Sequence, residues 1–572
     1  MPTKVNGYGP KNSKLLILGE YPTGDDEDSG IPFSGMQGDL LEKLCGAAGF
    51  KLEDTYRTNV SKVRPPHNDV RLFPSIGYKI EDFYEELEKE ILDIKPHCIL
   101  ALDNESLKAV SECSGIVKWR GSILRSRWPK IKVVASFHPN ALLHSPSTGQ
   151  KVDYSMKPIM ILDYKRALEE SFTNTYDVPD RNLMVCRSAY QLYKFLEKNE
   201  HNNVASVDIE SHNGIPICIG IAFNRHEALS IPLLSPIGWK DSLSDHELNE
   251  IWMLLIKWFE KPGLKLIGAN FKYDQWKLWT VCGFPVPDPY ADTMLMHHTW
   301  MPELPQSLAF ATSIHTREPY YKDEGKEYNP KKDKIDRMFL YNAKDCAVTY
   351  EVYEVLSKEL EEVQLLEFFY DFVMQLHPLY VHIEGNGFKV DEDKRKELQV
   401  KYRGKLLAAE KEFETVSGFR PVSAVELKKI VKDCKRDGTE LPLCINLGSP
   451  QQLAKLLYET LGFPNRKSTD EDTLVALQAN HSSKDEKKRR ILELILDIRK
   501  YQKTLGTYLS VKTDYDGRMR TSYRITGTET GRTSTSRLEP PVRPDKLGIA
   551  FQTMTKHGDI GAEVREMYVP GY

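Results

Sequence analysis

Ser206-Val207-Asp208-Ile209-Glu210 predicts a strand with two different faces. Alternate side chains of a strand point to opposite sides, so Val207 and Ile209 should enter a core while Asp208 and Glu210 share the other face. Short apolar runs at 204–209, 215–223, 228–232 and 264–269 and a helical pattern at 245–259 surround this stretch. This succession of strands and helices predicts an α/β domain whose sheet carries two neighbouring carboxylates.

Composition and periodicity divide the 572 residues into three predicted domains, 1–172, 173–365 and 366–572, of an α/β multidomain protein. The first has apolar runs at 15–18, 99–102 and 133–137 with helical patterns at 40–48 and 83–94, which predicts a mainly parallel sheet. The last is dominated by helical patterns to about residue 510 and then becomes rich in Thr, Gly and Arg.

The composition is ordinary, with 40% hydrophobic and 28% charged residues and a formal net charge of −4. It excludes collagen-like, low-complexity and wholly disordered chains. No apolar run approaches the roughly 18 residues of a membrane helix, and the N-terminus lacks a signal pattern. We therefore expect a soluble, unsecreted protein of the cytoplasm, or of the host cytoplasm if it is viral, with no membrane partner and with its nine cysteines reduced.

Two further acidic positions extend the pattern of Asp208 and Glu210. Asp274 lies where a strand runs into a helix, and Tyr341 and Asp345 share one helix face at i and i+4. Taken alone, each has a simpler interpretation, such as a solvated strand face or a favourable charge at a helix N-terminus. Four converging carboxylates would repel one another without cations. Together they predict two divalent ions, Mg²⁺ or Mn²⁺, placed for phosphodiester cleavage, with a tyrosine hydroxyl beside the attacking water.

The three motifs, in this order, resemble the proofreading 3′→5′ exonuclease domain of family A DNA polymerases. The resemblance implies a ribonuclease H-like fold, with DNA primer–template and single-stranded 3′ ends as partners. It implies that the metal ligands are Asp208, Glu210, Asp274 and Asp345, and that Tyr341 positions the water. Asp292 and Ser307 also fit the family's spacing, and we expect them to support the structure without binding metal.

The C-terminal region resembles the thumb and the start of the palm of the same family. Thr530-Gly531-Arg532-Thr533-Ser534 is similar to its Thr-Gly-Arg-x-Ser motif, and residues 491–509 are similar to its thumb helix. The resemblance implies a mainly α-helical region in which Arg499, Lys503, Arg532 and Ser534 bind DNA. Residues 499–546 hold eleven basic and five acidic residues, a balance that suits phosphate binding.

Arg565-Glu566-Met567-Tyr568-Val569-Pro570 resembles the step just before the first palm carboxylate of the polymerases. The metal-binding palm residues and the fingers would then lie beyond residue 572. We therefore expect this chain not to polymerise DNA by itself. A second polypeptide carrying the palm and fingers is one partner that would complete it.

Four motifs of the first region occur in a fixed order: Gly19-Glu20-Tyr21-Pro22, Ile31-Pro32-Phe33-Ser34-Gly35, the stretch 58–66 and the stretch 137–143. Together they resemble a family 4 uracil-DNA glycosylase. The resemblance implies a three-layer α/β/α domain in which Glu20 orients a water, Phe33 stacks on a flipped base, Asn59 reads the base edge and His138 stabilises the leaving uracil. Val63 stands where the family carries a cluster cysteine, and no N-terminal Cys-x-x-Cys precedes it, so we expect no iron–sulfur cluster. The domain is therefore either an active glycosylase or a base- or DNA-binding relic.

Three hypotheses follow for the chain. The favoured one is the N-terminal part of a bacteriophage-type family A DNA polymerase with metal-dependent 3′→5′ exonuclease activity. The second makes uracil excision the main activity. The third is a non-catalytic DNA-docking half of a split polymerase, which the complete carboxylate set argues against because unpaired buried charge destabilises a fold.

Overall fold

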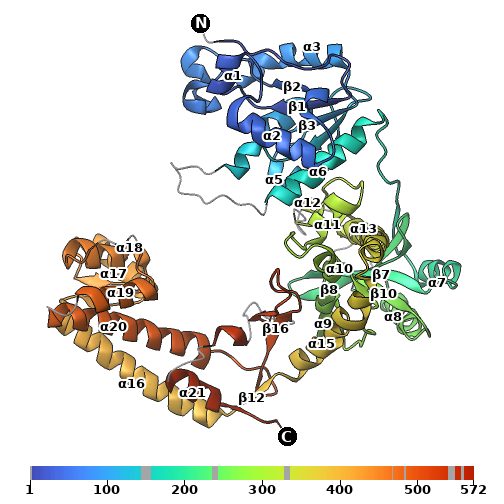
Figure 1. Cartoon of the computed structure of the whole chain (residues 1–572). Helices are drawn as coiled ribbons and strands as arrows, with labels where there is room; N and C mark the ends of the chain where they lie inside the picture. The colour runs from blue at the N-terminus through green and yellow to red at the C-terminus, as the bar shows by residue number, and fades with distance from the viewer. Residues whose placement is uncertain are drawn as a thin grey trace. The chain divides into compact units, whose positions relative to one another are not determined.

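The computed structural model describes residues 3–571 except 144–155, 235–242, 327–334, 465, 467, 482–484, 539–547 and 555–558. Its architecture is the predicted multidomain α/β fold with a mainly helical C-terminal region (Figure 1). Two compact units are present. The first comprises Met1–Leu379 with Thr528–Arg532, and the second comprises Tyr380–Gly527 with Thr533–Tyr572. Both predicted N-terminal domains thus lie in the first unit.

The N-terminal sheet has the strand order β2-β1-β3-β5-β4, in which only β4 runs antiparallel to its neighbour. Its strands are β1 (Leu15–Gly19), β2 (Tyr56–Asn59), β3 (Cys98–Ala101), β4 (Ile123–Arg125) and β5 (Lys132–Ala135). The helices that cover it are α2 (Gly35–Ala47), α3 (Tyr84–Ile94), α4 (Asn104–Val110) and α6 (Met156–Ser171). The strands predicted at 15–18, 99–102 and 133–137 are confirmed.

Alternation along these strands builds two cores, one on each side of the sheet. Leu16 and Leu18 pack with side chains of α3 and α4. Leu15 and Ile17 pack with side chains of α2 and α6 on the other face. Because helices cover both faces of the sheet, this is the three-layer α/β/α domain that the glycosylase resemblance implies.

The second sheet of the first unit has the order β11-β10-β7-β8-β9-β6. Its strands are β6 (Asn182–Val185), β7 (Val204–His212), β8 (Ile215–Asn224), β9 (Glu227–Pro232), β10 (Lys265–Gly268) and β11 (Ala291–Asp292). Its helices are α7 (Ala189–Lys198), α8 (Asp245–Phe259), α9 (Phe271–Cys282), α10 (Thr293–Trp300), α11 (Leu308–His315) and α13 (Ile335–Glu362). The central strands β7, β8 and β9 are antiparallel, while β10 runs parallel to β7.

The two faces of this sheet carry different neighbours. One face packs its apolar side chains, Val207 and Ile209 among them, against helices α7, α8 and α9. The other face is covered by α13, through small residues such as Ala343 and Ala347. Small side chains let the long helix approach the strands closely, and this sets up the site described below.

The second unit is built around the paired long helices α16 (Glu392–Ser417) and α20 (Glu486–Lys503) (Figure 1). Its other elements are α17 (Ala424–Asp437), α18 (Pro450–Ala454), α19 (Glu471–His481), α21 (Asp559–Glu566) and short strands, including β16 (Thr521–Arg524) and β17 (Ser534–Arg537). The helix predicted at 491–509 is not uniform. It is α-helical to Lys503 and continues as a π-helical turn over Thr504–Leu509.

Among the described residues, no helix combines the length and the apolar character that crossing a membrane requires.

Candidate active site

Strand β7 presents Asp208 and Glu210 on the face opposite to its core residues, as the sequence predicts. Val207 and Ile209 are buried in the apolar core, whereas the two carboxylates turn toward α13. In the antiparallel register Asp208 lies opposite Gly220 of β8. The pairing with β8 becomes irregular between Glu210 and Ser211, directly after the second carboxylate.

Helix α13 reaches this face because Gly220 has no side chain. A Cβ at Gly220 would lie 2.5 Å from Sγ of Cys346 and 2.7 Å from Oδ1 of Asn342. The close approach allows Nδ2 of Asn342 to donate both to the backbone carbonyl of Asp208, at 3.1 Å, and to its Oδ2, at 3.0 Å. The helix that carries Tyr341 and Asp345 is thereby fixed directly over β7.

Three of the four predicted carboxylates converge at one point. One oxygen each from Asp208, Glu210 and Asp345 lies within 4.8 Å of the others. Desolvation, followed by the charge of Asp345, raises the pKa of Asp208 to about 7. Desolvation, followed by the charges of Asp208 and Asp345, raises the pKa of Glu210 to about 9. At neutral pH Glu210 therefore holds a proton and Asp208 is about half protonated, unless a cation replaces these protons.

The fourth carboxylate, Asp274, lies behind the cluster. It is buried in the first turn of α9, and its Oδ1 accepts the backbone N–H of Ile209 at 2.9 Å. Desolvation, followed by the charge of Asp208, raises its pKa well above the usual range. Asp274 thus contacts the strand between the two β7 carboxylates, although it is not one of the three that converge most closely.

Tyr341 lies beside Asp345 in the same pocket of side chains. It is buried, and desolvation together with Asp345 raises the pKa of its hydroxyl far above the usual value, so the hydroxyl stays protonated. Two residues that the sequence analysis missed complete this corner. Tyr321 donates its hydroxyl to Oδ1 of Asp345 at 2.6 Å, and Lys322 forms an ion pair with Oδ2. They precede α12 (Asp323–Lys326), and no periodicity or spacing in the sequence links them to the site.

The donor set fits divalent metal ions. Mg²⁺ and Mn²⁺ prefer carboxylate oxygens, and the three converging groups and Asp274 supply only carboxylates. The raised pKa values of Asp208, Glu210 and Asp274 indicate that the protein alone does not compensate this much negative charge. Asp208, Glu210, Asp274 and Asp345 are therefore the residues that could hold such ions.

Asp292 and Ser307 have the supporting roles expected of them. Oδ1 of Asp292 accepts the backbone N–H groups of Asn270 and Met294, and its Oδ2 accepts that of Phe271. Asp292 thus fixes the turn that leads into α9 and Asp274. Ser307 caps α11 by accepting the N–H of Phe310.

A second set of predicted residues meets at the carboxyl edge of the N-terminal sheet. Gly19 ends β1, and a Cβ there would lie 2.5 Å from Oδ1 of Asn59 and 2.8 Å from Cζ of Phe33. The rings of Phe33 and His138 stack with centroids 5.8 Å apart. Glu20 directly follows Gly19, so the fold gathers the four predicted residues around the ends of β1, β2 and β5.

The electrostatics of this second set differ from those of the carboxylate cluster. Desolvation, followed by the charges of Asp103, Glu105 and Asp69, raises the pKa of Glu20 to about 8. Desolvation lowers the pKa of His138 to about 4, so its imidazole is neutral at pH 7. Its Nδ1 accepts the backbone N–H of Asn140 at 3.2 Å, which leaves Nε2 as the protonated nitrogen.

The DNA-binding residues predicted in the C-terminal region have different environments. Arg499 donates to the backbone carbonyls of Leu447 and Thr469, so its guanidinium already holds together parts of the second unit. Lys503 and Arg532 are exposed. Ser534 begins β17, opposite Arg524 of β16. Lys503 and Arg532 are therefore better placed to meet a phosphate than Arg499.

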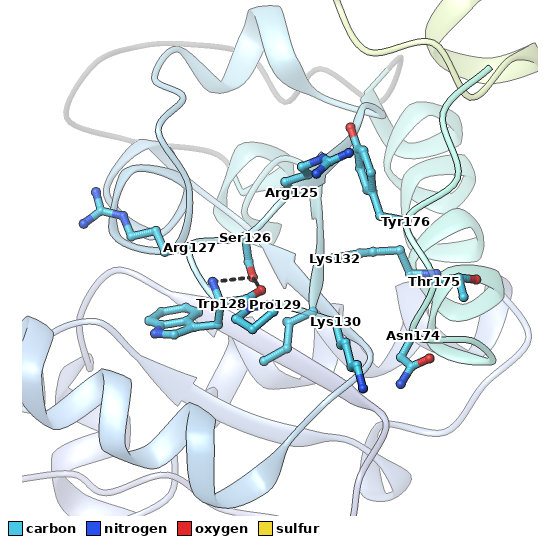
Figure 2. Close-up of a pocket in the computed structure, with 11 residues that line it drawn as sticks. Arg125, Ser126, Arg127, Trp128, Pro129, Lys130, Lys132, Asn174, Thr175 and Tyr176 are labelled. Atoms are coloured by element: carbon cyan, nitrogen blue, oxygen red, sulfur yellow. Dashed lines mark hydrogen bonds between the residues drawn. The ribbon is translucent and has the colours of Figure 1, made fainter. Parts of the chain in front are cut away.

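A basic hollow of about 610 Å³ lies beside β4 and β5, and no predicted site residue lines it (Figure 2). Its cations largely have internal partners. Lys132 pairs with Glu170, Arg125 stacks on Tyr176, and Arg127 donates to the carbonyl of Ser111. These contacts connect β4 and β5 to α6, to the chain that follows it and to the end of α4, so the cations have partners within the domain.

Three family models match successive parts of the chain. The uracil DNA glycosylase superfamily matches residues 6–158, the 3′-5′ exonuclease family matches 185–361, and DNA polymerase family A matches 422–571. The first two matches contain the two groups of residues described above. The chain thus consists of successive regions that are similar to a uracil DNA glycosylase, a 3′-5′ exonuclease and a family A DNA polymerase.

Individual relatives match either most of the chain or its N-terminal domain. The DNA polymerase of Bacillus phage SP01 is 22% identical over 618 residues, which cover 96% of this chain and 64% of that protein. DNA polymerase I of Borreliella burgdorferi is 26% identical over 553 residues, with 92% and 53% covered. The type-4 uracil-DNA glycosylase of Archaeoglobus fulgidus is 30% identical over 167 residues, with 27% and 82% covered.

The N-terminal domain belongs to the uracil-DNA glycosylase superfamily, and the regions that follow it are similar to the 3′-5′ exonuclease family and to DNA polymerase family A. The chain spans between about half and two thirds of the two polymerases just named. Among solved structures, the polymerase domain of Pol1 from M. smegmatis, complexed with DNA primer-template and dNTP, matches 68% of this chain and 59% of its own, with 17% identity and a TM-score of 0.47.

Proposed function

We propose that this chain is a metal-dependent 3′→5′ exonuclease that removes nucleotides from DNA 3′ ends. The observation that carries the proposal is the convergence of Asp208, Glu210 and Asp345, whose oxygens lie within 4.8 Å of one another. The match of residues 185–361 to the 3′-5′ exonuclease family supports it.

Each residue of the site has a role that its environment supports. Asp208, Glu210, Asp274 and Asp345 would hold two divalent ions, and these ions would stabilise the attacking and leaving oxygens of the phosphodiester. Tyr341 keeps its proton, so its hydroxyl can donate a hydrogen bond to a water or a phosphate oxygen. Asn342 fixes the orientation of the Asp208 carboxylate.

The expected substrates are single-stranded 3′ ends and primer–template DNA in complex with the second unit. The exposed side chains of Lys503 and Arg532 are the candidates for phosphate contact, and the hydroxyl of Ser534 is a further candidate as a hydrogen-bond donor. For Arg499, a DNA contact would have to share or replace its two carbonyl partners.

The test is digestion of a 5′-labelled single strand by the metal-free protein, with Mg²⁺ or with EDTA. A ladder of shortened products with Mg²⁺ alone supports the proposal. Loss of the label as a mononucleotide without a ladder would indicate the opposite polarity. No digestion with either Mg²⁺ or Mn²⁺ would overturn it.

Polymerisation is a separate question. The polymerase family model matches residues 422–571, and the expectation that this chain does not extend a primer stays a prediction. Adding nucleotides to the same reaction, with a primer–template, decides it.

A second candidate function is uracil excision by the N-terminal domain. The observation that favours it is the gathering of Glu20, Phe33, Asn59 and His138 at one sheet edge. A type-4 uracil-DNA glycosylase matches this domain at 30% identity over most of its own length. The test is formation of alkali-sensitive abasic sites in uracil-containing DNA with EDTA present. Their absence would leave base or DNA binding as the role of the domain.

A further inference from the structure

Lys322 places a positive charge directly on the carboxylate cluster. Its Nζ pairs with Oδ2 of Asp345 and donates to the hydroxyl of Tyr341 at 3.1 Å. The same ammonium lies over the rings of Tyr321 and Tyr341, 5.3 and 5.2 Å from their centroids. The side chain is 15% exposed, so its charge is only partly screened by water.

Both oxygens of Asp345 are occupied by this arrangement. Tyr321 donates to Oδ1 at 2.6 Å, and Lys322 holds Oδ2. A divalent ion that used Asp345 as a ligand would need one of these oxygens. Each oxygen keeps a second lone pair, but an ion bound to Asp345 would lie close to the Lys322 ammonium, and the two positive charges repel each other.

We propose that Lys322 is an internal counter-cation of the exonuclease site, whose ammonium must leave Asp345 before a divalent ion can bind there. The inference rests on the proposed function, because it requires that Asp345 is a metal ligand. It adds a residue that sets the metal affinity of the site. The Lys322 ammonium would stabilise the metal-free site by offsetting the negative charge of Asp345. For the same reason it would lower the affinity of the site for a metal ion.

Lys344 is a nearby lysine whose ion pair lies outside the carboxylate cluster. Lys344 lies 5.1 Å from the ring centroid of Tyr321, but its Nζ pairs with Glu324, at 2.9 and 3.2 Å, outside the carboxylate cluster. Lys344 thus shares the aromatic neighbour of Lys322 and lacks its contact with Asp345. It is the matched control.

The test is direct titration of the metal-free full chain with Mn²⁺, with free ion followed by electron paramagnetic resonance and no DNA present. We expect Lys322→Met and Lys322→Gln to bind Mn²⁺ at least about fivefold more tightly than wild type, the lower end of typical coupling between two sites. Lys322→Arg keeps the charge and should retain the wild-type affinity. Lys344→Met should also match wild type.

Each outcome has one meaning. Unchanged or weaker Mn²⁺ binding by both uncharged variants would overturn the proposal, and Lys322→Gln, which keeps hydrogen-bond donors, decides if Lys322→Met does not fold.

Asp208→Ala separates the proposal from the function on which it rests. If Asp208→Ala binds Mn²⁺ as wild type does, the metal site itself is wrongly assigned. If it loses Mn²⁺ while the Lys322 variants match wild type, only the role of Lys322 is wrong.

Discussion

Nδ2 of Asn342 donates to Oδ2 of Asp208 at 3.0 Å, and this bond joins helix α13 to strand β7 at the centre of the carboxylate site. Asn342 is fully buried, and its Oδ1 accepts the hydroxyl of Ser230 at 2.8 Å. The amide therefore connects strands β7 and β9 to helix α13. Its removal should disturb the position of Asp208, one of the proposed metal ligands.

Asn342→Ala should lower exonuclease activity by about 10–100-fold, the usual effect of removing a group that orients a metal ligand. The protein should still bind single-stranded DNA. The measurement is the rate of digestion of a 5′-labelled strand at saturating Mg²⁺. Asn182→Ala, at an exposed amide of β6, is the control and should leave the rate unchanged. Wild-type activity in Asn342→Ala would contradict the orienting role.

Gly220→Ala should destabilise the first unit by about 1–3 kcal/mol, the usual cost of overpacking. The added methyl group would meet Cys346 and Asn342 and push α13 away from β7. Thermal unfolding should show a lower midpoint, and Mn²⁺ affinity should fall with it. Gly46→Ala is the matched control, since its Cβ meets nothing within 4 Å on helix α2, and it should be neutral or slightly stabilising. Equal midpoints for the two variants would contradict the close approach.

The raised pKa of Glu210 should lower the free energy of unfolding of the metal-free protein as the pH rises. This pKa is raised to about 9, so the folded state binds a proton that the unfolded state releases above about pH 4. Stability therefore falls from that pH upward until the folded carboxyl group has also ionised. Unfolding midpoints of wild type and Glu210→Gln, compared in EDTA at pH 5.5 and 9, should show the variant gaining relative stability at pH 9. A constant difference between the two proteins would show that the pKa of Glu210 is not raised.

Mn²⁺ affinity should rise over the same interval, because the ion displaces protons from Asp208 and Glu210. Their pKa values of about 7 and 9 place most of the increase between pH 6 and 9. The measurement is the Mn²⁺ titration at several pH values in the absence of DNA. Affinity that does not change with pH would mean that these groups are already ionised in the metal-free protein.

If the N-terminal domain excises uracil, its rate should rise as the pH passes about 8. Glu20 must be ionised to orient a water as a base, and its pKa is raised to about 8. Glu20→Gln should abolish excision, whereas Glu53→Gln, at an exposed site, should not. The readout is abasic-site formation in EDTA. Excision by Glu20→Gln at the wild-type rate would remove Glu20 from the mechanism.

The alternation of Val207 and Ile209 with Asp208 and Glu210 was enough to predict the orientation of β7, because a strand has a fixed period of two. Short apolar runs located β1, β3 and β5, and a helical pattern located the helix Asp245–Phe259. The carboxyl ends of parallel strands meet at one sheet edge, so the meeting of Glu20 and His138 could also be expected from their positions after apolar runs. Asn59 could not be placed in this way, because the residues of β2 are mostly polar.

Lys322 and Tyr321 could not be predicted in this way. They reach Asp345 from a segment outside any regular element that is 23 residues away in sequence, and only the tertiary fold brings them there. The change to a π-helical turn at Thr504 could not be predicted either, since the six residues Thr504–Leu509 are too few to reveal a change of period. The carbonyl partners of Arg499 likewise lie in distant loops, which is why its sequence suggested DNA contact alone.

The measurement that tests the central claim most directly uses a primer–template with a 3′ mismatch and a label at the 5′ end of the primer. Wild type and Asp208→Ala are compared with Mg²⁺, with and without nucleotides, and Asp245→Asn, at an exposed helix N-terminus, is the control. We expect shortened primers from wild type and from the control in both conditions. With Asp208→Ala we expect the primer to stay intact but bound to the protein. Shortening by Asp208→Ala at the wild-type rate, or no shortening by wild type, would contradict the claim.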